Sequence, residues 1–128
     1  MTSESLAAFL ELLRESEREC VSALNTMTDS DAATQDLLHF LELKDPSPAE
    51  LVDIGERIVT IRQTRRAAKD RAEILSPVVE WIAQHKETVK SLERLLGELR
   101  KIENRHASRF YTPRTDAWDG LREPSADE

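Results

Sequence analysis

The sequence predicts an all-α fold, either a three- or four-helix bundle or an elongated antiparallel helical hairpin with coiled-coil-like packing. Apolar residues from Leu51 to His106 recur at alternating steps of three and four, which is typical of packed, gently supercoiled helices. The chain has only three glycines and no β-branched run with period-two alternation, so a β-sheet is not expected. A charged fraction of 34% beside a hydrophobic fraction of 39% is typical of long solvated helices. The stripe comprises Leu51, Ile54, Ile58, Ile61, Ala68, Ala72, Leu75, Val79, Ile82, His85, Val89, Leu92, Leu96, Leu99, Ile102 and His106.

Length and composition predict one helical domain over residues 1–110, followed by a tail over residues 111–128 that is first aromatic and then acidic. Residues near Glu4 lack the basic flank of a secretory signal. Apolar runs such as Leu6–Leu10 are far shorter than the roughly 20 residues of a membrane span. A single cysteine, Cys20, fits a reducing compartment. We therefore expect a cytoplasmic protein that does not enter a membrane.

The charges are strongly segregated along the chain. Residues 1–56 hold 13 acids and 3 bases, whereas residues 57–114 hold 14 bases and 7 acids. Such a pattern fits a basic surface for nucleic acid, or acidic helices that lie against basic ones within the chain or between subunits. The second interpretation is favoured, because strong binders of nucleic acid are usually basic overall and this chain carries a net charge of −7.

A first helix is expected to begin at a cap formed by Ser3 or Ser5 and to end near Thr26. Glu17 interrupts its apolar stripe, so either that part of the helix is solvated or Glu17 meets a basic partner. The predicted stripe comprises Leu6, Leu10, Leu13, Glu17, Cys20, Leu24 and Met27, with Phe9 and Val21 alongside.

A shorter second helix is expected to begin at one of the capping side chains in residues 28–31 and to end near Leu43. The clearest local signal follows, because Ser47 can cap a helix that has Pro48 as its first residue. Glu50 completes a capping box with Ser47. The sequence therefore predicts that a long helix begins there.

Arg65 falls on the apolar stripe of this long helix, where a buried guanidinium needs an acidic partner. Glu17, which interrupts the stripe of the first helix, is the candidate partner. Because of the 100° turn per residue, four bases share one face of the long helix. They are Arg62, Arg65, Arg66 and Lys69.

Pro77 leaves two alternatives open. Either Ser76 caps a new helix that begins at Pro77, or Pro77 kinks a helix that continues to about Ala83 and the chain reverses within residues 84–87. In both cases a final helix is expected to run to about Ser108. Opposite its apolar arc lie Lys90, Arg94, Lys101 and Arg105.

The segment from Phe110 to Trp118 holds three of the six aromatic residues of the chain. Pro113 ends the preceding helix. An aromatic segment after a helix usually docks on a protein surface, and docking on its own fold is favoured over a partner-binding motif.

Four runs in the C-terminal half combine charged and apolar residues. They are Ile61-Arg-x-x-Arg65-Arg66-x-x-Lys69-Asp70, Ile74-Leu75-x-Pro77, Leu96-Gly97-x-x-Arg100-Lys101-x-Glu103 and Arg109-x-Tyr111-x-Pro113-Arg114. These runs resemble small helical accessory proteins of unassigned function that phages and prophages of Gram-positive bacteria encode. This resemblance implies a phage accessory protein, of a kind that binds host proteins or nucleic acid. It implies no activity, cofactor or catalytic residue.

Catalytic motifs are weak in this sequence. Glu103 and His106 form an E-x-x-H pair of the di-iron type, but no second copy exists. Two pairs of acids with the spacing of magnesium ligands lie more than four turns apart on one helix and cannot converge within one subunit. The histidines are expected to pack rather than to bind a metal. These pairs are Glu50 with Asp53 and Asp70 with Glu73, and the histidines are His39, His85 and His106.

The sequence therefore predicts a non-enzymatic protein-interaction module with no cofactor and no metal, which self-associates through its apolar stripe and binds a host or phage protein. The alternative is a helical protein that binds nucleic acid through the basic faces of its last two long helices. The predicted partner-binding residues are Arg62, Arg66, Lys69, Lys90, Arg94, Lys101, Arg105, Tyr111, Arg114 and Trp118.

Overall fold

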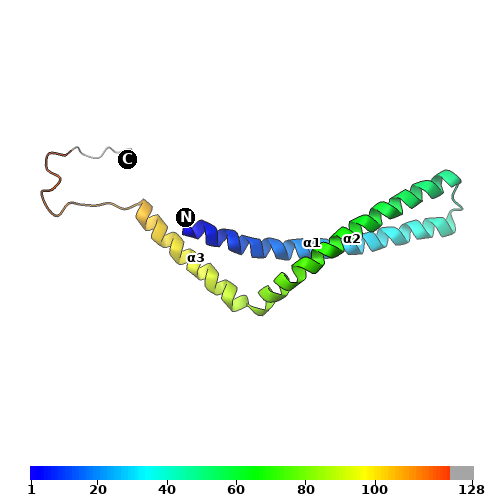
Figure 1. The fold of residues 1–128 in the computed structure, drawn as a ribbon, viewed down its shortest axis with the longest axis horizontal. Coiled ribbons are helices and arrows are strands. Elements are labelled where there is room, and N and C mark those ends of the chain that lie inside the picture. The colour runs from blue at the N-terminus through cyan, green and yellow to red at the C-terminus, as the bar shows by residue number, and fades with distance from the viewer. Residues whose placement is uncertain (122–128) are drawn as a thin grey trace.

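The computed structural model describes residues 1–121 and contains three α-helices. They are α1 (Thr2–Leu43), α2 (Pro48–Gln84) and α3 (Lys86–Ala107) (Figure 1). No β-strand occurs in the described part of the chain. The predicted all-α fold is thus confirmed.

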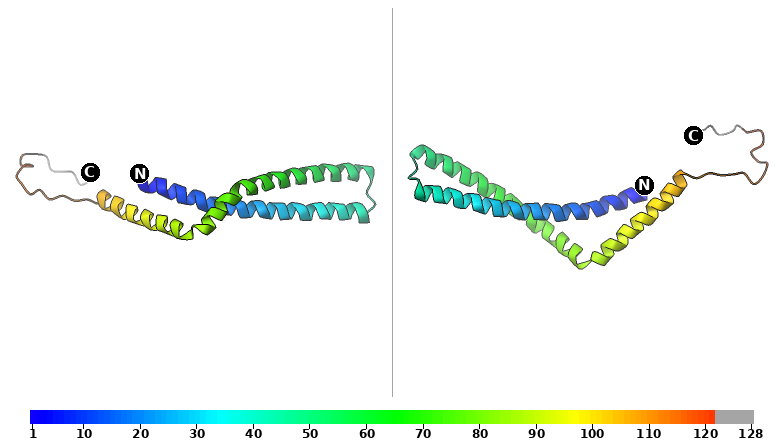
Figure 2. Two further views of the ribbon diagram at one scale, coloured as in Figure 1. Left: turned by 60° about the horizontal axis from the view of Figure 1, so that its bottom comes forward. Right: turned by 180° about the vertical axis from the view of Figure 1, so that it is seen from behind.

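The three helices form one elongated layer (Figures 1 and 2). α2 runs back along the second half of α1 as an antiparallel hairpin, crosses α1, and continues past it. The chain bends after α2, and α3 returns along the first half of α1 with little contact to α2. α1 is therefore the spine of the molecule, because its two halves pack against different helices.

α1 is one continuous helix of 42 residues, so the predicted break near Thr28 is wrong. The Thr28 hydroxyl donates to the carbonyl of Leu24 at 3.2 Å, as it would in a helix interior, and caps nothing. Ser30, another predicted cap, is buried. Packing against α2 along this stretch outweighs the capping preference of these residues.

The predicted cap of α1 at Ser3 or Ser5 is also wrong, because the helix begins at Thr2 and both serines lie inside it. Ser3 is buried, and its N–H donates to Glu103 of α3 at 3.2 Å. Its hydroxyl donates to the same carboxylate. A side chain of another helix thus satisfies an N–H of the first turn.

α2 begins as predicted, with Ser47 as the cap. The Glu50 N–H donates to the Ser47 hydroxyl at 3.3 Å, and the Ser47 N–H donates to the Glu50 carboxylate at 3.1 Å. Pro77 lies inside α2, which rules out a fourth helix beginning there. The chain changes direction at His85, within the predicted segment, although it bends toward α1 rather than reversing along α2.

The packed stripe of α1 differs from the predicted one where α2 crosses it. Ser16 and Ala23 are buried there, whereas Glu17 and Leu24, one position later, are exposed. Cys20 belongs to both stripes and is buried. Small side chains at this crossing let the two helix axes approach closely, which the larger Glu17 and Leu24 side chains would prevent.

The main apolar cluster lies where α1, the end of α2 and α3 meet. Its buried members are Leu10, Leu13, Ile82 and Leu96, and Leu6, Ala7, Val78, Val89 and Leu92 pack around them. Among residues 1–121, no helix combines the length and the apolar character that crossing a lipid bilayer requires.

Candidate protein-interaction surfaces

Basic residues of α2 form one cluster, as their spacing predicts. The four side chains line a small groove of about 100 Å³. Among residues 1–121, Arg65 alone of the four has an ion-pair partner. The residues are Arg62, Arg65, Arg66 and Lys69.

Ion pairs between helices account for part of the charge segregation. Arg65 Nε lies 2.7 Å from a carboxylate oxygen of Asp31, and Arg71 Nε lies 2.8 Å from that of Glu19. Both pairs join acidic α1 to basic α2. The predicted pairing of Arg65 with Glu17 is wrong, because the packed stripe of α1 turns Glu17 to solvent.

The basic residues of α3 are exposed, and they do not join the α2 cluster in one groove. Lys90 and Lys101 make only long pairs within α3, at 3.6 Å to Glu87 and 3.7 Å to Glu98. Arg94 and Arg105 have no ion-pair partner among residues 1–121, and both are exposed. The two basic faces are therefore separate surfaces.

The aromatic tail extends away from the helices instead of docking on them (Figure 1). The rings of Tyr111 and Trp118 contact each other, with centroids 5.7 Å apart. Both residues are exposed, as are Phe110 and Arg114. The predicted docking of this segment on its own fold is thus not observed.

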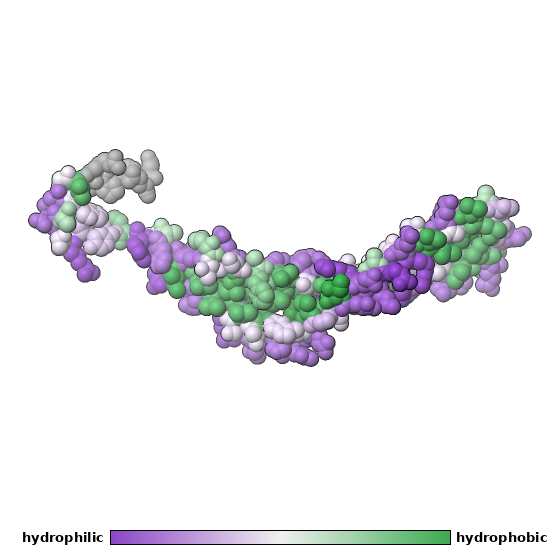
Figure 3. Space-filling model, viewed as in Figure 1, coloured by the Kyte–Doolittle hydropathy of each residue, from purple (hydrophilic) through white to green (hydrophobic). Residues whose placement is uncertain are grey.

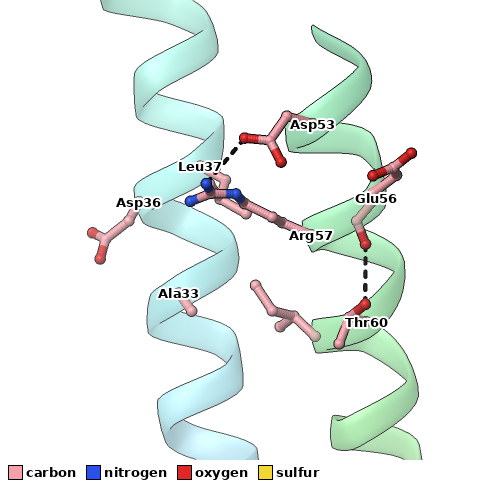
Figure 4. A pocket seen from close by; sticks show the side chains of 8 residues that line it. Ala33, Asp36, Leu37, Asp53, Glu56, Arg57 and Thr60 are labelled. Carbon is pink, nitrogen blue, oxygen red and sulfur yellow. Dashed lines mark hydrogen bonds and ion pairs between the residues drawn. The ribbon is translucent and has the colours of Figure 1, made fainter. Parts of the chain in front are cut away.

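The α1–α2 hairpin carries a groove of about 530 Å³ that is open to solvent (Figure 4). Ala33 and Thr60 have small side chains and leave this space between the helices. Arg57 crosses it from α2 toward α1 and pairs with Asp53 at 3.0 Å. The remaining lining residues are Asp36, Leu37, Glu56 and Ile61.

A second apolar stripe follows each helix one position before the packed stripe. Its members are large apolar side chains spaced by three or seven residues, which keeps them on one side of each helix, so each helix presents two neighbouring apolar faces. Four large members border the main cluster and remain 38–48% exposed. These four are Phe9, Trp81, Leu95 and Ile102; the second stripes comprise Phe9 and Leu12 on α1, Ile74 and Trp81 on α2, and Leu95 and Ile102 on α3.

The second stripes of α1 and α3 lie on the same side of the layer. The two helices run antiparallel, with their packed stripes facing each other. Moving back by one residue along either helix rotates the side-chain direction by about 100°. Because the helices are antiparallel, both rotations point to the same side of the layer. The positions one step later lie on the other side. On that other side, Arg14 Nη2 and Glu93 Oε1 pair at 3.3 Å. Each of these residues follows a packed-stripe residue by one position, so their contact agrees with this assignment of the two sides.

We call the exposed side chains of the second stripes the apolar face. Figure 3 shows a broad hydrophobic surface over the region where the three helices meet. Its α1 and α3 members are Phe9, Leu12, Leu95 and Ile102, and its α2 members are Ile74 and Trp81.

The predicted site residues do not include the apolar face. Sequence reasoning placed Phe9 beside the packed stripe and counted Ile102 in it. Large apolar residues one position before the packed stripe were the available signal. The sequence could not show which of two neighbouring apolar stripes on a helix would be buried in the fold.

The polar motifs of the sequence have structural contacts instead of a common site. Glu103 of the E-x-x-H pair accepts from Ser3, and these hydrogen bonds lower the pKa of Glu103. His106 and His39 are exposed, contrary to the prediction that they pack. His85 stacks on Trp81, with centroids 4.4 Å apart. Within residues 1–121, no three His, Cys, Asp or Glu side chains gather as metal ligands would.

Comparison with protein-family models, with curated proteins and with solved structures finds no match to this chain.

Proposed function

We propose that the chain is a non-enzymatic protein-interaction module whose binding surface is the apolar face. The observation that supports this proposal is the group of large side chains that border the main cluster and stay 38–48% exposed. A contiguous apolar surface of this kind is typical of protein-binding sites on otherwise charged molecules. Self-association is one expected mode of binding.

The resemblance to phage and prophage proteins supports a host or phage protein as a further partner, met in the cytoplasm. In this role the module acts by occupancy, as a stiff helical surface that blocks or bridges its partner. Tyr111, Arg114 and Trp118 in the extended tail stay predicted partner contacts, and their exposure leaves them accessible.

Capture of binding proteins from a Gram-positive lysate tests this proposal when a face variant is compared with a matched control. Phe9→Glu combined with Leu95→Glu places two charges on the apolar face. Val59→Glu places one on an exposed site of the hairpin. We expect the face variant to lose proteins that the wild type and the control retain, with helicity unchanged in circular dichroism. Equal capture by all three chains would contradict the proposal.

Nucleic-acid binding is the second candidate, supported by the α2 basic cluster. Arg62, Arg66 and Lys69 have no ion-pair partners among residues 1–121, so their charges are available to phosphates. Binding through phosphates falls steeply with salt. A mobility-shift series with duplex and single-stranded DNA and RNA at rising salt tests this role. Absence of any shift at low salt would remove this candidate.

A further inference from the structure

The helices that carry the apolar face form a single layer. A stable domain usually packs at least two layers around its core, because a helix layer that is apolar on one side needs a cover. The main cluster here is enclosed at its edges by three helices, and the apolar face lies over it. The missing element is therefore a second layer on that face.

The surface area shows how much of the chain is left uncovered. The accessible surface is 10284 Å². A compact protein of 14.6 kDa would expose about 6,900 Å². The excess is larger than the roughly 800 Å² per partner that a standard stable interface buries. The extended tail contributes to this excess together with the open helical layer, so the molecule as a whole has area to spare for a dimer of ordinary size.

Charge indicates what kind of layer fits. Residues 2–20 of α1 hold five acids and two bases, whereas α3 holds six bases and four acids over residues 86–107. The apolar face thus lies between an acidic helix and a basic one. A second copy turned about a twofold axis places its basic α3 on the acidic α1 and its own α1 on α3, so one surface complements itself.

We infer that the apolar face binds the same face of a second copy, with α1 of each chain antiparallel to α3 of the other. This inference rests on the proposed function and names the partner at that surface. Phe9, Leu12, Leu95 and Ile102 of both copies meet in the middle as a four-helix core. The twofold axis runs parallel to the helices.

The contacts within one chain set the register of this dimer. Ser3 lies at the height of Glu103, and Arg14 lies at the height of Glu93. Rotation about a twofold axis parallel to the helices does not change the position of a residue along the helix axis. It therefore brings Glu15 to within roughly 3–5 Å of Arg94 of the second copy, measured along the helix axis.

The alternative twofold axis, across the helices, gives a different charge pattern. It stacks α1 on α1 and α3 on α3, so acidic residues face acidic ones and basic residues face basic ones. Repulsion at both flanks disfavours this arrangement. The two arrangements bury the same apolar side chains, so charge reversal can distinguish them.

Light scattering after size exclusion gives the first part of the test. The wild-type chain is expected at about twice 14.6 kDa at micromolar concentration. Phe9→Glu with Leu95→Glu is expected at 14.6 kDa with unchanged helicity, and Val59→Glu is expected to stay dimeric. A monomeric wild type would overturn the inference. A monomer that still captured another protein through the same face would leave the proposed function standing with a different occupant.

Charge reversal gives the second part. Glu15→Lys, and separately Arg94→Glu, are each expected to raise the dimer dissociation constant about threefold, because the twofold axis repeats the pair. Both changes in one chain are expected to restore it to near the wild-type value, because the pair regains opposite charges. No loss in the separate variants, or no recovery in the combined one, would overturn the arrangement of α1 on α3.

Discussion

At the residue scale, the crossing of α1 and α2 depends on side-chain size. Ser16, Cys20 and Ala23 are buried where the helices meet, and Ala72 of α2 is buried opposite them. The Ser16 hydroxyl donates to the carbonyl of Leu12 at 2.8 Å, so its burial leaves no unsatisfied polar atom. Hydrophobicity alone favours the larger Leu24 for the packed stripe, which is why the sequence prediction went wrong here.

Exchanging size between neighbouring positions tests this packing. Ala23→Leu is expected to lower the free energy of unfolding by about 1–3 kcal/mol, because the added methyl groups enter a filled space. Leu24→Ala is expected to change it by less than about 0.5 kcal/mol, because Leu24 is exposed. Urea unfolding followed by circular dichroism measures both. The opposite order of effects would favour the stripe predicted from sequence.

Glu103 makes the contact between α3 and the first turn of α1 dependent on pH. Hydrogen bonds from Ser3 lower the pKa of Glu103 from its ordinary value of 4.5. The stabilisation is therefore complete above pH 4.5 and is lost as the pH falls through the lowered pKa. Thermal unfolding from pH 6 to pH 2 should show a larger drop in Tm for the wild type than for Glu103→Gln.

This comparison removes the contribution of the other carboxylates, because both proteins carry them. A distance measured between spin labels near Thr2 and Asn104 provides a second readout, which should lengthen in acid only in the wild type. Parallel acid profiles of the two proteins would contradict the role assigned to Glu103.

At the element scale, the start of α2 was predictable and the course of α1 was not. Ser47, Pro48 and Glu50 satisfy each other locally, so no distant contact is needed to fix that helix start. Residues 28–31 of α1 contain equally good capping side chains, yet the helix passes through them. A cap is used only where the chain leaves the helix, and packing against α2 keeps α1 helical.

Two serines that precede prolines provide a matched test of capping. Ser47→Ala is expected to lower the free energy of unfolding by about 1 kcal/mol, because the first turn of α2 loses its cap. Ser76→Ala is expected to have little effect, because Ser76 lies inside the continuous α2. Urea unfolding compares them. Equal losses for both would indicate that a new helix begins at Pro77.

At the scale of the whole molecule, the spacing of apolar residues predicted the all-α class and most of the packed stripe. It could not show that α3 would pack on the first half of α1 instead of on α2. The turn at His85 decides that, and its direction depends on contacts among Ile82, Leu10 and Leu96. The basic cluster of α2 was predicted correctly, because four residues on one helix face depend only on helix geometry.

The apolar face follows from this open arrangement, in which each helix has two apolar stripes and covers only one. Trp81 lies in that face, and the chain has one other tryptophan, Trp118, in the extended tail. Trp118→Phe therefore leaves Trp81 as the only tryptophan reporter, without changing the three-helix layer.

Acrylamide quenching of Trp81 fluorescence in this variant, followed on dilution from micromolar to nanomolar protein, tests the coverage of the apolar face most directly. We predict weak quenching and blue-shifted emission at high concentration, and stronger quenching as dilution separates the two copies. Strong quenching that does not change with protein concentration would show Trp81 open to water throughout, and would contradict a second copy on the apolar face.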